Sequence, residues 1–103
     1  MTAAWQYIDD VVRWLDDSNS GSDPAMGLVK ISEELGEVAQ AYSGSLGRNP
    51  RKGVTHARDD VAAELCDVIL AAMVSLHDFT DQPAEFFEKR VGAGVERLKG
   101  LTS

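Results

Sequence analysis

"LCDVILAAMVSL", residues 65–76, is the stretch that decides the fold, because wound as a helix it is apolar on nearly every side. A helix with no polar face must be covered all round. Three other short helices of one chain can hardly do that alone, so we predict that a second subunit covers part of this helix. The alternative is a single bundle in which this helix lies at the centre.

The rest of the chain is also expected to be helical. Its apolar residues recur with a period of about 3.6, and no segment alternates cleanly as a strand would. Prolines and glycines divide the chain into helices expected at about residues 3–17, 24–43, 55–78 and 83–99. The predicted fold class is therefore all-α, a four-helix antiparallel bundle that assembles as a homo-oligomer.

Cap residues and buried stripes refine this prediction. Asp23 is expected to cap the second helix, with Pro24 in its first turn. Thr55 is expected to cap the third helix, and Asp81 to cap the fourth ahead of Pro83. The predicted buried face comprises Trp5, Ile8, Val12 and Leu15 on the first helix, and Leu28, Ile31, Leu35, Val38 and Tyr42 on the second.

Length and charge limit what the protein can be. The 103 residues are enough for one domain, which we place over residues 1–103. A net charge of −7 should repel nucleic acid and anionic lipid. It should also repel ligands that carry phosphate, unless a metal cation stands between them and the protein.

Nothing in the sequence marks the chain for a membrane or for export. No apolar run is long enough to span a bilayer. The start, "MTAAWQYIDD", has neither a basic region nor an apolar signal core. The single cysteine, Cys66, can form no internal disulfide, which fits a reducing compartment. We therefore expect a cytoplasmic protein, with Cys66 a buried small hydrophobic residue.

Two groups of acids border the apolar stripes. In "VKISEELGEVAQA", residues 29–41, Glu34 and Glu37 project within roughly 60° of each other on the helix, beside the apolar stripe. The next helix repeats this arrangement, with Asp60, Glu64 and Asp67 in one sector. Asp60 lies near the start of that helix, where a capping role accounts for it as well as a ligand role does.

Carboxylates buried beside a core are costly unless a cation neutralises them. Two Mg²⁺ ions would neutralise four carboxylates, and hard oxygen ligands suit Mg²⁺ or Mn²⁺. No histidine stands three residues from a glutamate, which argues against iron, and no Cys/His cluster suggests zinc. One such pair of acids is commonly a solvated surface feature, but two pairs that both border a core stripe favour a metal site.

The acids also carry a family resemblance. "EELGE", residues 33–37, followed after a basic loop by "ELCD", residues 64–67, resembles the pattern Glu-Glu-x-x-Glu … Glu-x-x-Asp of the MazG-type nucleoside triphosphate pyrophosphohydrolases. That all-α superfamily also contains the dimeric dUTPases and phosphoribosyl-ATP pyrophosphatase. The resemblance covers residues 25–78 well and the last helix loosely.

The resemblance implies a metal site and a reaction. Glu34, Glu37, Glu64 and Asp67 match the metal-binding acids of the family, with Mg²⁺ as the expected cofactor and Mn²⁺ as a substitute. Glu33 matches the leading glutamate, which in relatives helps to hold or activate the attacking water. The reaction splits a nucleoside triphosphate between its α and β phosphates, giving a monophosphate and pyrophosphate.

Basic residues are candidates for binding the phosphates. The loop "GRNPRKGVTH", residues 47–56, holds Arg48, Arg51, Lys52 and His56, although these cations could equally be solvated charges. Lys30 could reach a phosphate, or it could pair with Glu34 one turn on.

The last helix matches the family less well. Lys89 matches a lysine that relatives place there, but the asparagine that often follows is missing. The identity of the nucleobase and sugar is therefore not predicted. Trp5 is expected to pack in the core, and His77 to interact with the negative end of its helix.

Three hypotheses follow. The first is a Mg²⁺-dependent pyrophosphohydrolase that removes unwanted nucleoside triphosphates. The second is a related enzyme that acts on phosphoribosyl-ATP or on a dinucleotide-like compound. The third is a non-catalytic helical dimerisation module, in which the acids are exposed and bind no divalent ion. The first two predict a nucleotide substrate in a homodimer or homotetramer, with neither nucleic acid nor membrane as partner.

Overall fold

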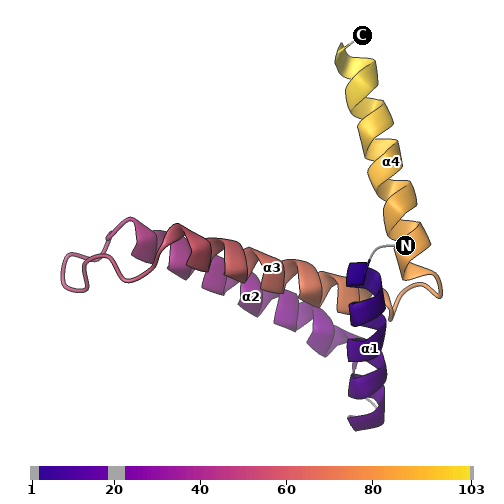
Figure 1. Ribbon diagram of the computed structural model, residues 1–103, viewed down its shortest axis with the longest axis horizontal. Coiled ribbons are helices and arrows are strands. Elements are labelled where there is room, and N and C mark those ends of the chain that lie inside the picture. The colour runs from indigo at the N-terminus through magenta and orange to yellow at the C-terminus, as the bar shows by residue number, and fades with distance from the viewer. Residues whose placement is uncertain (1–2, 19–22, 103) are drawn as a thin grey trace.

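The structure, a computed structural model, describes residues 3–18 and 23–102. Over these residues it contains four helices and no strand (Figure 1). The helices are α1 (Ala3–Ser18), α2 (Pro24–Ser45), α3 (Arg58–Leu76) and α4 (Pro83–Thr102). The all-α fold class and the number of helices predicted from the sequence are therefore confirmed.

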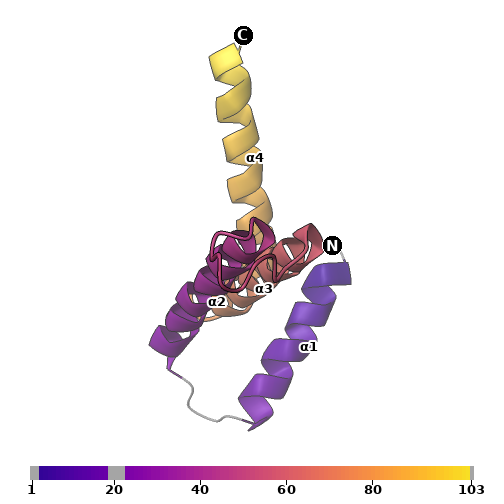
Figure 2. The same cartoon turned by 90° about the vertical axis from the view of Figure 1, so that its left-hand side faces the viewer.

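Helices α2 and α3 form an antiparallel pair joined by the loop over residues 46–57 (Figures 1 and 2). Small residues lie where the two helices approach, with Ala41 only 1% exposed and Ala71 8% exposed. Gly27, Glu34 and Ala41 are spaced seven residues apart, so they lie along one line on α2. Glu34 is buried on this line, and the fold therefore holds a carboxylate inside a helix interface.

The predicted buried face of α2 is partly wrong. Leu28, Leu35 and Tyr42 are each about half exposed. The helix is rotated so that Gly27, Glu34 and Ala41 face α3, and the glycine and the alanine allow a closer approach than leucine or tyrosine side chains would permit. The predicted stripe of α1 is confirmed at Trp5 and Ile8, which are buried.

Three of the four helices start where predicted, α1 at Ala3, α2 at Pro24 and α4 at Pro83. Asp23 caps α2, because its Oδ1 accepts a hydrogen bond of 3.0 Å from the backbone N–H of Ala25. Pro83 opens α4, but Gln82 rather than Asp81 stands immediately before it, and the Gln82 carbonyl accepts a hydrogen bond from Phe86 N–H.

The start of α3 is later than predicted. Ala57 rather than Thr55 takes the cap position, and the Asp60 carboxylate accepts a 2.8 Å hydrogen bond from Ala57 N–H. The capping interpretation of Asp60 is therefore confirmed. Thr55 donates its own N–H to the carbonyl of Gly44, which ties the loop back to α2 and keeps it outside the helix.

The principal core lies where α1 crosses α3. Trp5, Ile8 and Ala84 form a buried cluster, with Val12, Met73, Val74 and Leu76 packed against it. His77, at the C-terminal end of α3, lies 3.0 Å by its Nε2 from Asp9 Oδ1 and 3.0 Å by its Nδ1 from the carbonyl of Met73. His77 therefore occupies the helix end predicted for it and also joins α1 to α3.

Helix α4 projects away from the other helices (Figures 1 and 2). The radius of gyration is 17.1 Å, whereas a compact chain of this length has about 13 Å. On α3, Leu65 is 46% and Ile69 58% exposed. The apolar helix is therefore not enclosed by the other helices of its own chain.

Cys66 was expected to be buried, and this expectation is wrong because its side chain is exposed on α3. It lies in the same uncovered part of α3 as Leu65. In the described ranges, no helix combines the length and the apolar character needed to cross a membrane.

Candidate functional site

Three glutamates from the two paired helices converge. One carboxylate oxygen each of Glu34, Glu37 and Glu64 lies within 4.8 Å of the others. Glu34 and Glu37 are neighbours because they stand about one turn apart on α2. Glu64 reaches them from α3, across the interface that buries Glu34. These three acids are called the glutamate cluster below.

The electrostatics of the cluster disfavour three free negative charges. The negative charge of Glu34 raises the pKa of Glu37, and a hydrogen bond to Glu64 together with its charge raises this pKa further. The Oε2 atom of Glu64 is buried and has no hydrogen-bond partner among the described residues. Closely spaced carboxylate oxygens fit the ligand preference of a hard divalent cation, and the unpartnered Oε2 belongs to one of these three residues.

Lys30 neutralises only part of this charge. Its Nζ lies 3.0 Å from Glu34 Oε1, and this hydrogen bond is the main reason why the pKa of Lys30 is raised. The pairing interpretation of Lys30 is therefore confirmed. Because one lysine faces three carboxylates, the cluster as a whole remains acidic.

The remaining predicted acids lie outside the cluster. Asp67 follows Glu64 by about one turn of α3 and is exposed, but it lines the same pocket as Glu34. Glu33 is exposed on α2. The structure thus brings together three of the four predicted metal ligands and places the fourth beside them.

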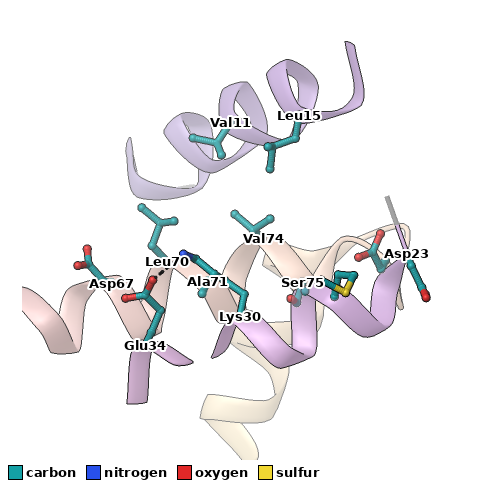
Figure 3. A pocket seen from close by; sticks show the side chains of 13 residues that line it. Val11, Leu15, Asp23, Lys30, Glu34, Asp67, Leu70, Ala71, Val74 and Ser75 are labelled. Atoms are coloured by element: carbon teal, nitrogen blue, oxygen red, sulfur yellow. Dashed lines mark ion pairs between the residues drawn. The ribbon is translucent and has the colours of Figure 1, made fainter. Parts of the chain in front are cut away.

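A pocket of about 430 Å³ adjoins the cluster between α1, α2 and α3 (Figure 3). Glu34 belongs to both the pocket and the cluster. The residues that line the pocket are Val11 and Leu15 from α1; Asp23, Met26, Gly27, Lys30 and Glu34 from α2 and its cap; and Asp67, Leu70, Ala71, Val74, Ser75 and Asp78 from α3 and the turn after it.

The pocket is long, apolar along its sides and polar at both ends. Glu34 marks one end and Asp23 the other, eleven residues away on α2, which corresponds to about 16 Å. Because α3 runs antiparallel to α2, Asp67 lies at the Glu34 end and Asp78 at the Asp23 end. Aliphatic side chains cover the length between them.

Ser75 is a polar residue on the pocket wall that the sequence did not single out. It is 4% exposed, and its Oγ is buried without a hydrogen-bond partner among the described residues. Gly27 faces it, since a Cβ at Gly27 would lie 2.7 Å from Ser75 Oγ. The seven-residue spacing of Gly27, Glu34 and Ala41 was the available signal that Gly27 belongs to the helix contact.

The basic loop lies at the outer end of the α2–α3 pair. From Glu37 to the end of α2 at Ser45 is eight residues, or about 12 Å. Arg48 stacks its guanidinium over the ring of Tyr42, at 5.6 Å from the ring centroid. Lys52 lines a second cavity of about 370 Å³ with Gln40, Ser43, Gly44, Asn49, Gly53, Thr55 and His56.

Two further cations complete the predicted phosphate-binding residues. Arg51 is exposed in the basic loop, and Lys89 is exposed on the projecting helix α4 (Figure 1). Neither lines the pocket beside the cluster. Of the predicted cations, only Lys30 does so within one chain.

Comparison of the chain with protein-family models, with curated proteins and with solved structures finds no significant match in any of the three. The likeness to the MazG-type enzymes therefore depends on the two short motifs at residues 33–37 and 64–67. What the structure adds is the geometry of their side chains and of the pocket beside them.

Proposed function

We propose that the protein is a divalent-cation-dependent enzyme that hydrolyses nucleoside triphosphates between the α and β phosphates. The observation that supports this most directly is the junction of the glutamate cluster with the pocket. Glu34 belongs to both, so a cation held by the cluster would lie next to a ligand in the pocket.

Glu34, Glu37 and Glu64 would hold the ion, with Asp67 as a further ligand on the pocket side. Mg²⁺ is the proposed ion, and Mn²⁺ an effective substitute, because all the available ligands are carboxylate oxygens. When bound, such an ion supplies the positive charge that phosphate groups need in order to approach this acidic chain.

The side chains of the protein have separate roles in this proposal. The pocket binds the nucleoside, with its apolar walls against the base, and Lys30 pairs with a phosphate oxygen next to Glu34. Glu33, exposed on α2 beside the cluster, holds the attacking water and accepts its proton. The water oxygen bonds to the α phosphorus, and the bond to the bridging oxygen breaks, which releases pyrophosphate.

The other cations are proposed to assist at a distance. Arg48, Arg51 and Lys52 lie in the loop that follows α2, and none of them lines the pocket. Long arginine and lysine side chains there would attract the released pyrophosphate. Lys89 on α4 could act only at the site of a neighbouring subunit, because α4 projects away from its own chain.

The exposed apolar residues support a homodimer or homotetramer. Leu65 and Ile69 on α3, and Phe86 and Val91 on α4, are each between 46% and 58% exposed. A second copy that packs its helices on these residues would complete a bundle around α3. We propose this arrangement for the same reason that the sequence suggested it: an apolar helix needs cover on every side.

The decisive experiment is an assay of products. The protein is incubated with Mg²⁺ and a panel of nucleoside triphosphates, and pyrophosphate and orthophosphate are measured separately. We expect pyrophosphate, with a fall in kcat of at least about a hundredfold for Glu64→Gln or Asp67→Asn. Glu88→Gln, which removes an exposed glutamate on α4, should leave the rate unchanged. Orthophosphate as the main product would contradict the proposal.

The same panel separates the two alternatives. Inclusion of phosphoribosyl-ATP and a dinucleotide tests the related enzyme activity. A non-catalytic dimerisation module predicts that no substrate is cleaved and that calorimetry detects no binding of Mn²⁺ even at about millimolar concentration. If the wild type binds the metal and Glu37→Gln does not, the hypothesis of a non-catalytic dimerisation module is contradicted.

A further inference from the structure

We propose that the pocket end remote from the glutamate cluster selects nucleobases with an exocyclic amino group over those with a carbonyl at the same position. Cytosine would thus be preferred to uracil, and adenine to hypoxanthine. This inference depends on the function proposed above, because it identifies the substrate class of that same site. The residues that carry it are Asp78, Asp23 and Ser75.

Hydrogen-bond acceptors dominate this end of the pocket. Asp78 and Asp23 both line it, and an ionised carboxylate only accepts hydrogen bonds. Asp23 already uses Oδ1 for the N–H of Ala25. Among the described residues that form the pocket wall, Lys30 is the only cationic one, and it lies at the opposite end, paired with Glu34. An amino group would find acceptors here, whereas a carbonyl oxygen would face negative charge.

Ser75 gives a second and independent sign that a polar ligand atom belongs at this end. Its Oγ is shielded from solvent and has no partner among the described residues, although its side chain forms part of the pocket wall. A buried hydroxyl without a hydrogen bond is unfavourable. The hydroxyl lies against Gly27, where a Cβ would be only 2.7 Å from Oγ, and a small rotation of Ser75 would turn it toward a polar atom of a ligand in the pocket.

The length of the pocket fits a nucleoside in one orientation. The phosphates must lie at the Glu34 end, where the cluster and Lys30 are. The base then points toward the Asp78 carboxylate, whose Oδ2 lies 4.0 Å from a Cβ placed on Gly27, seven residues or about 10 Å from Glu34 along α2. Val11 from α1 and Val74 from α3 lie on opposite sides of this path (Figure 3), so a flat ring can pack between them.

The test compares two matched pairs of substrates, CTP with UTP and ATP with ITP. The two substrates of each pair differ at one ring position, where an amino group is replaced by a carbonyl. The adjacent ring nitrogen carries a proton only in the carbonyl compound. We expect kcat/KM to be at least about tenfold higher for CTP and ATP, since a hydrogen bond to a charged acceptor contributes at this level. Equal values within both pairs would overturn the inference.

Substitution of Asp78 locates the selectivity. In Asp78→Asn the side chain can also donate a hydrogen bond, so the preference should fall to about twofold or less. Asp81→Asn is the matched control, because Asp81 is an exposed aspartate three residues further on that does not line the pocket. It should keep the wild-type ratios, and a wild-type ratio in Asp78→Asn would contradict the assignment. The comparison within wild-type protein does not depend on the folding of any variant.

Binding measurements separate this inference from the proposed reaction. Calorimetry with CMP and UMP in the presence of Mg²⁺ tests the pocket without hydrolysis. Tighter binding of CMP that disappears in Asp78→Asn, without any cleavage of triphosphates, would support the pocket assignment and reject the proposed reaction. Cleavage of triphosphates without any preference for amino-bearing bases would support the proposed reaction and reject the pocket assignment. If neither monophosphate binds, the inference is wrong.

Discussion

Glu37 is the residue whose ionisation is most constrained by its neighbours. It is exposed, yet the charge of Glu34 and the contact with Glu64 both raise its pKa. Glu34 cannot move away easily, since it is buried in the α2–α3 interface. The electrostatic repulsion between these carboxylates is therefore relieved by a proton or a cation, and these two compete for the same oxygens.

The pH dependence of stability should reveal this competition. The unfolded chain ionises Glu37 at the ordinary pKa, and the folded chain holds the proton to higher pH. The stability contributed by this group is therefore complete below the ordinary pKa and is lost as the pH rises through the folded pKa. We expect the Tm of the metal-free protein to contain such a falling component as the pH rises above 4.5, the ordinary pKa of a glutamate.

Glu37→Gln should remove this loss of stability with rising pH. The variant should be more stable than the wild type at neutral pH without metal, and it should gain less from added Mg²⁺. Thermal unfolding with and without Mg²⁺ measures both effects. Glu88→Gln removes a glutamate outside the cluster and should respond to Mg²⁺ as the wild type does. A Glu37→Gln protein that loses stability and keeps the full Mg²⁺ response would show that the three oxygens do not share a cation.

At the scale of the elements, the α2–α3 contact depends on residues with little or no side chain. Gly27 meets Ser75, and Ala41 and Ala71 are almost completely buried. Their small size brings the helices close enough for Glu34 and Glu64 to meet. The geometry of the site is therefore a consequence of the packing of these two helices.

Alanine at Gly27 tests this close approach. Gly36, on the same helix, has no atom within 4 Å of a Cβ placed there. Gly36→Ala should therefore stabilise the protein by up to about 1 kcal/mol, the difference in helix propensity. Gly27→Ala gains the same propensity but meets Ser75 Oγ at 2.7 Å, and a crowded core contact costs about 1–3 kcal/mol.

A double variant provides the control. Ser75→Ala removes the hydroxyl and leaves the next atom 3.8 Å from the new methyl group. The combination of Gly27→Ala with Ser75→Ala should therefore recover most of the lost stability, which chemical denaturation of all four proteins can measure. Strictly additive effects would mean that these two residues do not touch.

The sequence predicted the elements better than it predicted their faces. Apolar periodicity and the cap at Asp23 gave the four helices. The start of α3 was missed because the Thr55 N–H bonds to Gly44 across the loop, a contact that local sequence does not reveal. The exposure of Leu35 was missed because the rotation of α2 is set by close packing against α3 and not by the most apolar stripe.

The candidate site was predictable where it depended on one helix. The spacing of Glu34 and Glu37 alone places them side by side. That Glu64 joins them while Asp67 lies along the pocket depends on the relative shift of two helices, which the sequence does not specify. Ser75 and the pocket walls were missed because they belong to three different elements.

At the scale of the whole molecule, the described part of one chain encloses only a small core. The main buried cluster contains only Trp5, Ile8 and Ala84, and the molecule extends over 50 × 48 × 24 Å. Large apolar side chains on α3 and α4 remain exposed. Burial of apolar surface is the main favourable term in folding, so an association of copies is expected to supply what one chain lacks.

Light scattering after gel filtration should therefore give a mass of at least two chains. Ile69→Glu on α3 and Val91→Glu on α4 each place a charge on an exposed apolar position and should shift the protein toward monomer with a lower Tm. Arg90→Glu, next to Val91 but on a polar position of α4, should leave the mass unchanged. A stable wild-type monomer at about micromolar concentration would exclude the proposed association.

The attachment of α1 has a mechanical consequence for the pocket. This helix is anchored at Trp5 and Ile8, whereas Leu15, seven residues and about 10 Å beyond Ile8, forms part of the cavity wall. Turned about its anchored end by about ten degrees, it would carry Leu15 by roughly 2 Å. Substitutions of Trp5 would therefore change how closely the cavity walls contact a bound base, although Trp5 does not line the cavity.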